Sequence, residues 1–289
     1  MSDSKIALDT TQATIDDFGA QWSRFRENND YYGSTELLQD IFGPLLKLND
    51  IVGRRTAEIG SGSGRIVLML LHSGAAHVTA VEPSEAITVL QENTRQFADR
   101  ITYVRARGEE IPLDAAFDYI FSIGVLHHIP DPAPVVSAAF RALKPGGKML
   151  IWVYGREGNE AYLFWALPLR RLTRRLPDAV LAVFSSGLNI FLGLYVWLCR
   201  WLPLPMRSYM KNHIGKLSWE DRYLTIFDQL NPTEARYYYE KDARALLSDA
   251  GFRDIANFQR HGYSWTVLGV KPNQFLNRDT GPGDPPSDL

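Results

Sequence analysis

A glycine-rich stretch at residues 56–65 constrains the fold more than any other feature of this chain. It reads Thr-Ala-Glu-Ile-Gly-Ser-Gly-Ser-Gly-Arg, and an apolar run over residues 66–71 follows it. Glycine tolerates positive φ and, because it lacks a Cβ atom, lets a ligand lie against the backbone. A helix that begins after such a turn presents free N–H groups to that ligand. The stretch therefore predicts a strand, a tight ligand-binding turn and a buried helix.

The spacing of the glycines and two nearby acids indicate which ligand binds. A dinucleotide fingerprint needs G-x-G-x-x-G, but Arg65 stands at its third position. Glu82 ends the next predicted strand, where a carboxylate can accept hydrogen bonds from both ribose hydroxyls. Glu58 directly precedes the turn and would face the positive amino group of a methionine-like ligand. The two acids together suit S-adenosylmethionine (SAM) better than NAD.

Apolar runs and helical patterns alternate on both sides of the turn. Strands are expected at 56–59, 78–81, 101–104, 117–122 and 148–154, and helices at 65–72, 84–97 and 133–143, with Ser84 as an N-cap. Two helices at 11–26 and 34–46 precede them, and a helix at 240–250 with strands at 252–259 and 265–271 follows. This alternation predicts a parallel sheet with helices on both faces and a ligand site at the carboxyl ends of its strands.

Three further stretches extend the pattern, at residues 106–113, 117–129 and 143–147. With the glycine turn and Glu82 they resemble, in the same order, the motifs of the class I SAM-dependent methyltransferases. The resemblance covers roughly residues 54–154 and is weaker at 240–271. It implies a doubly wound, Rossmann-like α/β sheet of seven strands in the order 3-2-1-4-5-7-6. It also implies SAM as the methyl donor and S-adenosylhomocysteine as the product.

The resemblance also implies the residues of the cofactor site. An acid of the family usually recognises the adenine amino group, but Arg107 stands at its position, and arginine has no hydrogen-bond acceptor. The backbone of Gly108 or the side chain of Glu109 is expected to read adenine instead. The expected cofactor-binding residues are Trp22, Glu58, Gly60, Ser61, Gly62, Gly64, Glu82, Pro83, Arg107, Gly108, Glu109 and Ser122.

Candidate catalytic residues follow the fourth and fifth strands and the insertion. Methyl transfer from a sulfonium needs mainly in-line approach, which proximity supplies, and a base is required only if the acceptor must lose a proton. The candidates are His127, His128, Tyr154 and Asp228. The histidines could equally fix a loop or pack on the cofactor. Tyr154, Arg156 and Asp228 are expected as polar anchors of a mostly apolar acceptor pocket.

The chain is expected to divide into an N-terminal helical lid at 1–48, a SAM-binding core at 49–155, a hydrophobic insertion at 156–230, a C-terminal part of the core at 231–272 and a disordered tail at 273–289. Phe18, Trp22 and Phe25 recur at helical spacing in the first part. They form either a stripe packed into the core or a lid over the cofactor.

The insertion contains residues 179–199 without one charge, which is long enough to span a bilayer. Its flanks belong to one sheet and must lie on the same side, so we expect a helix that does not span, with breaks at Gly187 and Gly193. It could cover the acceptor pocket, form a homodimer interface, or rest on a membrane surface through residues 170–205. We favour a pocket cover with some membrane affinity.

Composition narrows the class of partner. The net charge of −2 gives no field that would favour nucleic acid, and the single Cys199 fits a reducing compartment. No signal peptide or metal-binding acidic cluster is evident, so we expect a cytoplasmic protein, with membrane association as the alternative. The predicted function is methyl transfer to an oxygen or carbon of a small or lipid-like acceptor. The alternatives are another group transfer from SAM, or a membrane-peripheral binding protein with a vestigial SAM site.

Overall fold

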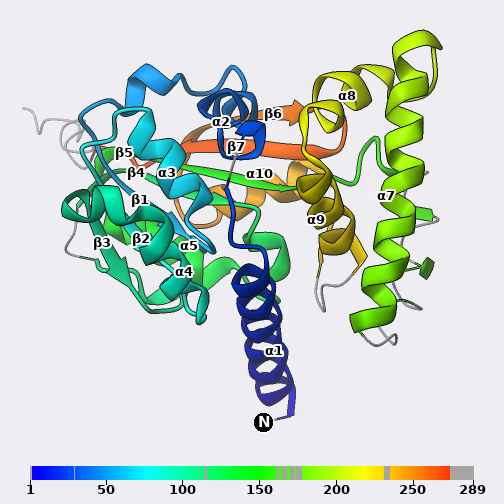
Figure 1. Cartoon of the computed structure of the whole chain (residues 1–289). Helices are drawn as coiled ribbons and strands as arrows, with labels where there is room; N and C mark the ends of the chain where they lie inside the picture. The colour runs from blue at the N-terminus through cyan, green and yellow to red at the C-terminus, as the bar shows by residue number, and fades with distance from the viewer. Residues whose placement is uncertain are drawn as a thin grey trace, which may run out of the picture.

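The computed structural model describes residues 2–28, 30–113, 116–160, 163–164, 168–169, 173, 178–230 and 235–273. It is built around one seven-stranded sheet (Figure 1). The strands are β1 (Arg55–Ile59), β2 (His77–Val81), β3 (Ile101–Val104), β4 (Phe117–Ile123), β5 (Leu143–Tyr154), β6 (Arg253–Arg260) and β7 (Ser264–Val270). Their order is β3-β2-β1-β4-β5-β7-β6, with β7 antiparallel to both of its neighbours. The predicted fold class and strand order are confirmed.

The central strands are apolar because helices cover both of their faces. β1 and β2 are buried at every position after the first, which is typical of parallel strands between two helical layers. In β1, Glu58 lies between Ala80 of β2 and Phe121 of β4. This acid therefore sits at the centre of the sheet, one residue before the strand ends.

One core lies on each face of the sheet. The first contains Leu38, Phe42, Met69, Leu70 and Leu90. These come from α2 (Thr35–Phe42), α3 (Arg65–His72) and α4 (Ala86–Thr94). The second contains Val135, Ala139, Leu247 and Phe252, of which the first three come from α5 (Ala133–Ala142) and α10 (Glu240–Ser248). Burial on both faces is what fixes the strands relative to the helices that carry site residues.

The helix predicted at 84–97 is shorter than expected. α4 ends at Thr94, and a 3-10 turn (Arg95–Arg100) with non-helical φ at Phe97 follows. Glu85, and not Ser84, occupies the N-cap position. The Ser84 hydroxyl accepts a hydrogen bond from Ala86 N–H but is also bonded to Glu82, so it serves the site as well as the helix.

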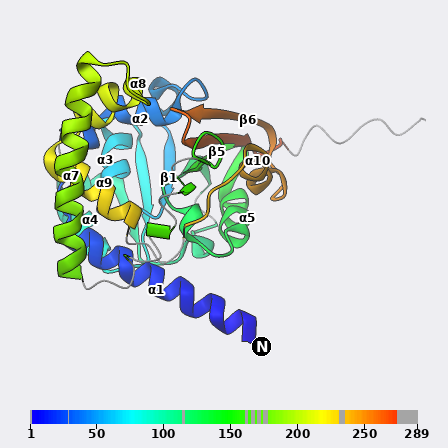
Figure 2. The same ribbon diagram turned by 90° about the vertical axis from the view of Figure 1, so that its right-hand side faces the viewer.

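The N-terminal helix α1 (Ser2–Arg24) projects from the body of the protein, and its last turns pack against α4 (Figures 1 and 2). A Cβ atom on Gly19 would lie 2.9 Å from Ser84 Cβ, so the two segments meet at very close range. Glycine at this position allows α1 to reach the cofactor end of the sheet.

The insertion forms α7 (Asp178–Trp201), α8 (Arg207–Asn212) and α9 (Trp219–Leu230). α9 lies between α7 and the sheet, and α7 forms the outer layer (Figures 1 and 2). α7 is continuous, so the breaks expected at Gly187 and Gly193 are wrong; the buried contacts of Leu181 with Phe227 hold it on α9. Within the described ranges, residues 180–201 are the one helix whose length and composition would suffice to cross a membrane.

Candidate functional site

The turn after β1 has the backbone conformation that the glycine pattern predicts. Gly60 and Gly62 adopt φ of 80° and 50°, in the left-handed region that disfavours side chains. A Cβ atom on Gly60 would lie 2.5 Å from Val125, and one on Gly62 would lie 3.0 Å from Trp22 Nε1. The glycines therefore keep the backbone close to the loop after β4 and to α1.

A cavity of about 300 Å³ opens at the carboxyl ends of β1, β2 and β4. We call it the cofactor cavity. Most of the predicted cofactor residues line it: Trp22, Glu58, Gly60, Ser61, Gly62, Glu82, Pro83, Arg107, Gly108 and Glu109. Gly64 and Ser122 do not. Gly64 is the N-cap of α3, and the Ser122 hydroxyl is fully buried 3.5 Å from the Ile59 carbonyl.

Glu82 is held in place by the turn and by its own loop. Its Oε2 atom accepts a hydrogen bond of 2.8 Å from Gly62 N–H. Its Oε1 atom accepts from the Ser84 N–H at 3.0 Å and from the Ser84 hydroxyl at 2.5 Å. A carboxylate has about four acceptor positions, so one position on Oε2 is left for a ligand.

Glu58 is 1% exposed, and its Oε2 atom makes no hydrogen bond within the part of the chain that is described. Burial raises the pKa of this carboxyl to about 8, although the charge of Arg65 and a hydrogen bond to Ser61 act in the opposite direction. A buried acceptor without a donor is costly. A ligand that brings a cation to the cofactor cavity would relieve this cost.

The loop after β3 reaches across to α1. Arg107 donates a hydrogen bond of 3.1 Å to Gln12, and its own N–H donates to Glu110. A Cβ atom on Gly108 would lie 2.7 Å from Ile59, so only glycine brings this backbone so close to β1. Arg107 thus connects the helix α1 with a wall of the cofactor cavity.

The aromatic stripe of Phe18, Trp22 and Phe25, which lies in the last turns of α1 and directly after it, faces the protein. Phe18 packs on His128, with ring centroids 4.7 Å apart, and Trp22 packs on the glycine turn. Phe25 packs instead on Tyr223 and Phe227 of α9. The stripe therefore contributes to packing at one end and lines the cofactor cavity at the other. Thr14 and Ile15, which sequence reasoning missed, also line the cavity.

A second cavity, of about 340 Å³, adjoins the first and shares Phe18, Trp22, Arg65, Ile123 and Gly124 with it. We call it the acceptor cavity because we propose that the methyl acceptor binds there. Aromatic rings dominate its wall, which is formed by Tyr32, Trp152, Tyr154, Tyr209, Tyr237 and Tyr263. Residues of α8 and α9 cover it, but no described residue of α7 does. The expectation that 179–199 covers the pocket is therefore wrong, because α9 lies in between.

The candidate catalytic residues occupy different positions. His128 lines the cofactor cavity and Tyr154 the acceptor cavity. His127 lines neither; it is fully buried, with its ring 4.2 Å from that of His128 and 3.9 Å from that of Tyr154. Asp228 belongs to α9, but its side chain lies outside the described residues.

Arg156 is not the acceptor anchor that the sequence suggested. Its side chain is exposed and stacks over Tyr239, 5.4 Å from the ring centroid. The polar wall of the acceptor cavity comes from other residues, among them Arg260 and His213. Sequence reasoning missed Arg260. Among the described residues, no group of three His, Cys, Asp or Glu side chains could hold a metal ion.

Comparison with known proteins agrees with this geometry. Residues 57–151 match a methyltransferase domain family. A ubiquinone biosynthesis O-methyltransferase of Aromatoleum aromaticum is 32% identical over 130 residues, which are 44% of this chain and 55% of that protein. Another of the same name, from Alkalilimnicola ehrlichii, is 30% identical over 185 residues, covering 59% of this chain and 72% of that protein. This chain spans about half the length of several such relatives.

Solved structures support the fold alone. An O-methyltransferase family protein from Burkholderia thailandensis aligns with a TM-score of 0.50 at 12% identity, over 83% of this chain and 57% of that one. Four findings agree on the family of this chain. They are the glycine turn, the acids at the ends of β1 and β2, the strand order, and the relative that is matched over most of its length. The chain belongs to the class I SAM-dependent methyltransferases.

Proposed function

We propose that the protein transfers the methyl group of SAM to an oxygen atom of a small aromatic acceptor. One observation carries this proposal: the cofactor cavity and the acceptor cavity meet at a shared wall of Phe18, Trp22 and Gly124. Two adjoining compartments are what a transfer between two bound molecules requires. The names of the relatives support oxygen as the methylated atom.

The chain's own residues fit SAM at distinct points. The unpaired Oε2 atom of Glu58 would take the ammonium group of the methionine part, and the open position on Glu82 would take a ribose hydroxyl. The backbone at Gly60 and Gly62 lets the ligand lie close. Gly108 and Glu109 line the cavity where adenine would be read, since Arg107 offers no acceptor. Bound SAM supplies an electrophilic methyl group on a sulfonium.

Positioning accounts for most of the chemistry on the acceptor side. The aromatic wall holds a planar acceptor and excludes water, which favours in-line approach. If the acceptor hydroxyl must lose its proton, His128 and Tyr154 stand at the boundary between the cavities, with their rings 5.8 Å apart. His127 packs on both and would position them. Asp228 remains a candidate base, and we propose no other role for it.

The activity can be tested with labelled SAM and a simple phenolic acceptor. Purified protein, SAM carrying a radioactive methyl group and 3,4-dihydroxybenzaldehyde should give S-adenosylhomocysteine and a methyl ether. A product that carries another part of SAM would favour a different group transfer. Tight SAM binding without turnover, over a panel of phenols, would favour the binding protein with a vestigial site.

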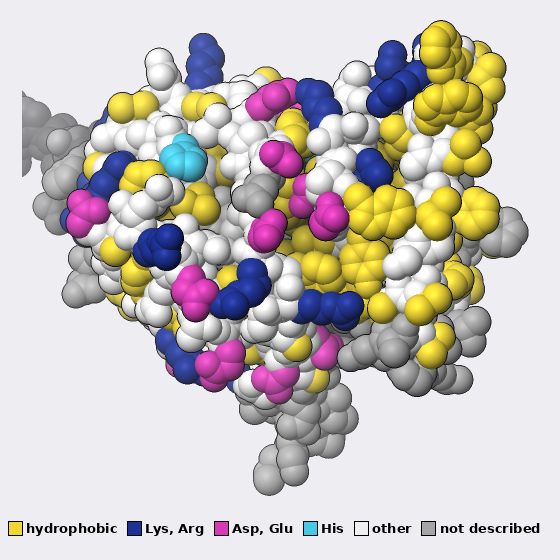
Figure 3. Space-filling model, viewed as in Figure 1, with side chains coloured by type: hydrophobic (Ala, Val, Ile, Leu, Met, Phe, Trp, Pro, Cys, Tyr) yellow, Lys and Arg dark blue, Asp and Glu magenta, His cyan; other side chains and the backbone are white. Residues whose placement is uncertain are grey.

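We propose further that α7 rests on an anionic membrane surface, from which a lipid-like acceptor could enter. Its outer side exposes Val183, Ile190, Phe191, Leu194, Trp197 and Trp201, each by more than half. Figure 3 shows hydrophobic side chains gathered over this edge of the molecule. Residues 179–219 contain Arg200, Arg207, Lys211 and Lys216 but no acid. An apolar surface beside a basic one is the pattern of interfacial helices.

Flotation with vesicles tests this surface. The protein should float with vesicles that contain phosphatidylglycerol and stay behind with purely zwitterionic ones. A protein that does not float and elutes as a dimer would instead identify α7 as the subunit interface that the sequence left open.

A further inference from the structure

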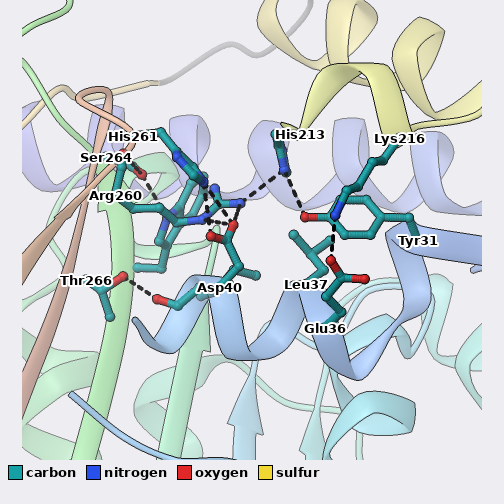
Figure 4. Close-up of polar contacts among 12 residues, drawn as sticks. Tyr31, Glu36, Leu37, Asp40, His213, Lys216, Arg260, His261, Ser264 and Thr266 are labelled. Carbon is teal, nitrogen blue, oxygen red and sulfur yellow. Dashed lines mark hydrogen bonds and ion pairs between the residues drawn. The ribbon is translucent and has the colours of Figure 1, made fainter. Parts of the chain in front are cut away.

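A polar cluster interrupts the aromatic wall of the acceptor cavity. Arg260 ends β6, Asp40 comes from α2, and His213 follows α8 (Figure 4). Arg260 and His213 both line the cavity. The Arg260 side chain is only 2% exposed, and it is the largest fully buried side chain of the described residues.

The hydrogen bonds of Arg260 account for all but one of its donors. Nε and Nη2 both donate to Asp40 Oδ2, at 2.8 and 2.5 Å. Nη2 also donates to His213 Nδ1 at 3.3 Å, and Nη1 donates to the Tyr263 hydroxyl. A guanidinium group has five N–H bonds. The one remaining N–H bond is on Nη1, and the Arg260 side chain lines the acceptor cavity.

The contact with Arg260 fixes the protonation of His213. Since a guanidinium can only donate, Nδ1 of His213 must accept, and the neutral ring then carries its proton on Nε2. Burial, together with the charge of Arg260, lowers the pKa of His213 to about 3, so the ring is neutral at physiological pH. Within the described part of the chain, Nε2 makes no hydrogen bond. His213 therefore offers a second N–H donor.

The cluster presents donors without presenting net charge. Burial raises the pKa of Asp40, but hydrogen bonds and charge from His261 and Arg260 outweigh it and lower the pKa to about 2. Asp40 is therefore ionised and balances Arg260. A carboxylate ligand would bring an additional buried negative charge next to Asp40, which is costly. An uncharged oxygen could accept from the Nε2–H of His213, which points away from Arg260, without that cost.

We propose that the Nε2–H of His213, in the tautomer that Arg260 fixes, donates to an uncharged carbonyl oxygen of the acceptor, and that Asp40 excludes acceptors that carry a carboxylate at this position. This inference rests on the proposed function only in naming the ligand a methyl acceptor. The alternative is a purely structural ion pair that holds α2 against the β6–β7 hairpin. Such a pair would affect stability but would not discriminate between ligands.

Calorimetric titration of three probes separates these alternatives. Catechol, 3,4-dihydroxybenzaldehyde and 3,4-dihydroxybenzoate differ at one substituent and are titrated with and without S-adenosylhomocysteine. In the native protein the aldehyde should bind about tenfold more tightly than catechol, and the benzoate more weakly than the aldehyde. The variant Asp40→Asn leaves Arg260 uncompensated, so the benzoate should gain about tenfold relative to the aldehyde.

Two further variants complete the test. His213→Phe keeps a ring but loses the donor, and should reduce the preference for the aldehyde over catechol about fivefold. Arg253→Met, an exposed arginine on the same strand, is the matched control and should change nothing. If Asp40→Asn does not fold, His213→Phe carries the test alone.

Three outcomes would overturn the inference: equal binding of the three probes to the native protein, no binding of any probe, or an unchanged order of preference in both folded variants. None of these is the failure of the proposed function, which would appear as lack of S-adenosylhomocysteine binding or formation. Because the probes are also titrated without that ligand, the donor site can be judged even if the methyltransferase activity is absent.

Discussion

SAM binding should depend on pH through Glu58. This carboxyl is buried, has an unpaired oxygen, and has a pKa raised to about 8 by burial. At pH 7 it is then roughly nine-tenths protonated in the free protein. An ammonium group is bound by the carboxylate and not by the neutral acid. SAM binding should therefore release close to one proton, and SAM affinity should rise by up to about tenfold for each pH unit between 6 and 8.

Isothermal titration calorimetry measures both quantities. Titrations at pH 6.5, 7.0 and 7.5, in two buffers with different heats of ionisation, give the affinity and the number of protons released. Glu58→Gln should bind SAM more weakly and show neither proton release nor pH dependence. Glu92→Gln, an exposed acid on α4, serves as the control. An affinity of the native protein that stays level from pH 6 to 8, with no proton release, would refute the assignment of Glu58.

The same shift predicts the stability of the free protein. The pKa of Glu58 is raised in the folded state above the ordinary value of 4.5. Between pH 4.5 and 8 the folded state thus binds more protons than the unfolded state, and stability falls as pH rises. Glu58→Gln should consequently unfold at a higher temperature than the native protein at pH 8 without SAM. A lower unfolding temperature for this variant would contradict the argument.

Three other predictions follow from the site and from α7. Glu82→Ala removes a charged acceptor and should weaken SAM binding by about 1.5–3 kcal/mol, or roughly ten- to a hundredfold; unchanged affinity would exclude the ribose role. Trp22→Ala opens the lid over Gly62 and should weaken SAM binding while the unfolding temperature changes little. If the variant binds SAM as tightly as the native protein, Trp22 contributes only to packing. Phe191→Glu with Trp197→Glu should abolish vesicle flotation but not methylation of a soluble phenol, and recovery of the native protein only in detergent, after high salt and alkaline washing, would instead indicate an integral segment.

The sequence predicts most of the sheet because its signals are local. Apolar runs identified the strands, and the glycine turn with Glu82 predicted that both acids lie at the carboxyl ends of neighbouring strands, where the structure has them. The exceptions also have local causes. β5 begins at Leu143 and not at 148 because Leu143 already pairs with Phe117, one residue before an irregularity in the register. The helix after β2 divides at Thr94, where its hydroxyl bonds to Leu90 and Tyr103.

The packing of the insertion was harder to predict because its own residues do not indicate which segments it contacts. The glycines of α7 suggested breaks, yet helix geometry tolerates Gly187 and Gly193 at a modest cost of about 1 kcal/mol each. The apolar composition suggested a buried pocket cover, yet α9 takes that place and leaves one side of α7 exposed. The composition of a segment indicates that it prefers an apolar environment. It does not indicate which neighbouring segment, subunit or membrane provides that environment.

The polar cluster of the acceptor cavity could not be predicted because tertiary folding alone assembles it. Asp40 and Arg260 are 220 residues apart in sequence. Asp40 gave one local signal, because it is a charged residue between Leu37 and Ile41, which are buried on α2. By contrast, the residues that match the methyltransferase domain, 57–151, include most of the cofactor cavity and few residues of the acceptor cavity. The part of the chain that this family match covers therefore forms most of the cofactor cavity, whereas segments outside it form most of the acceptor cavity. We propose that the choice of acceptor depends on those segments, through Arg260 and His213.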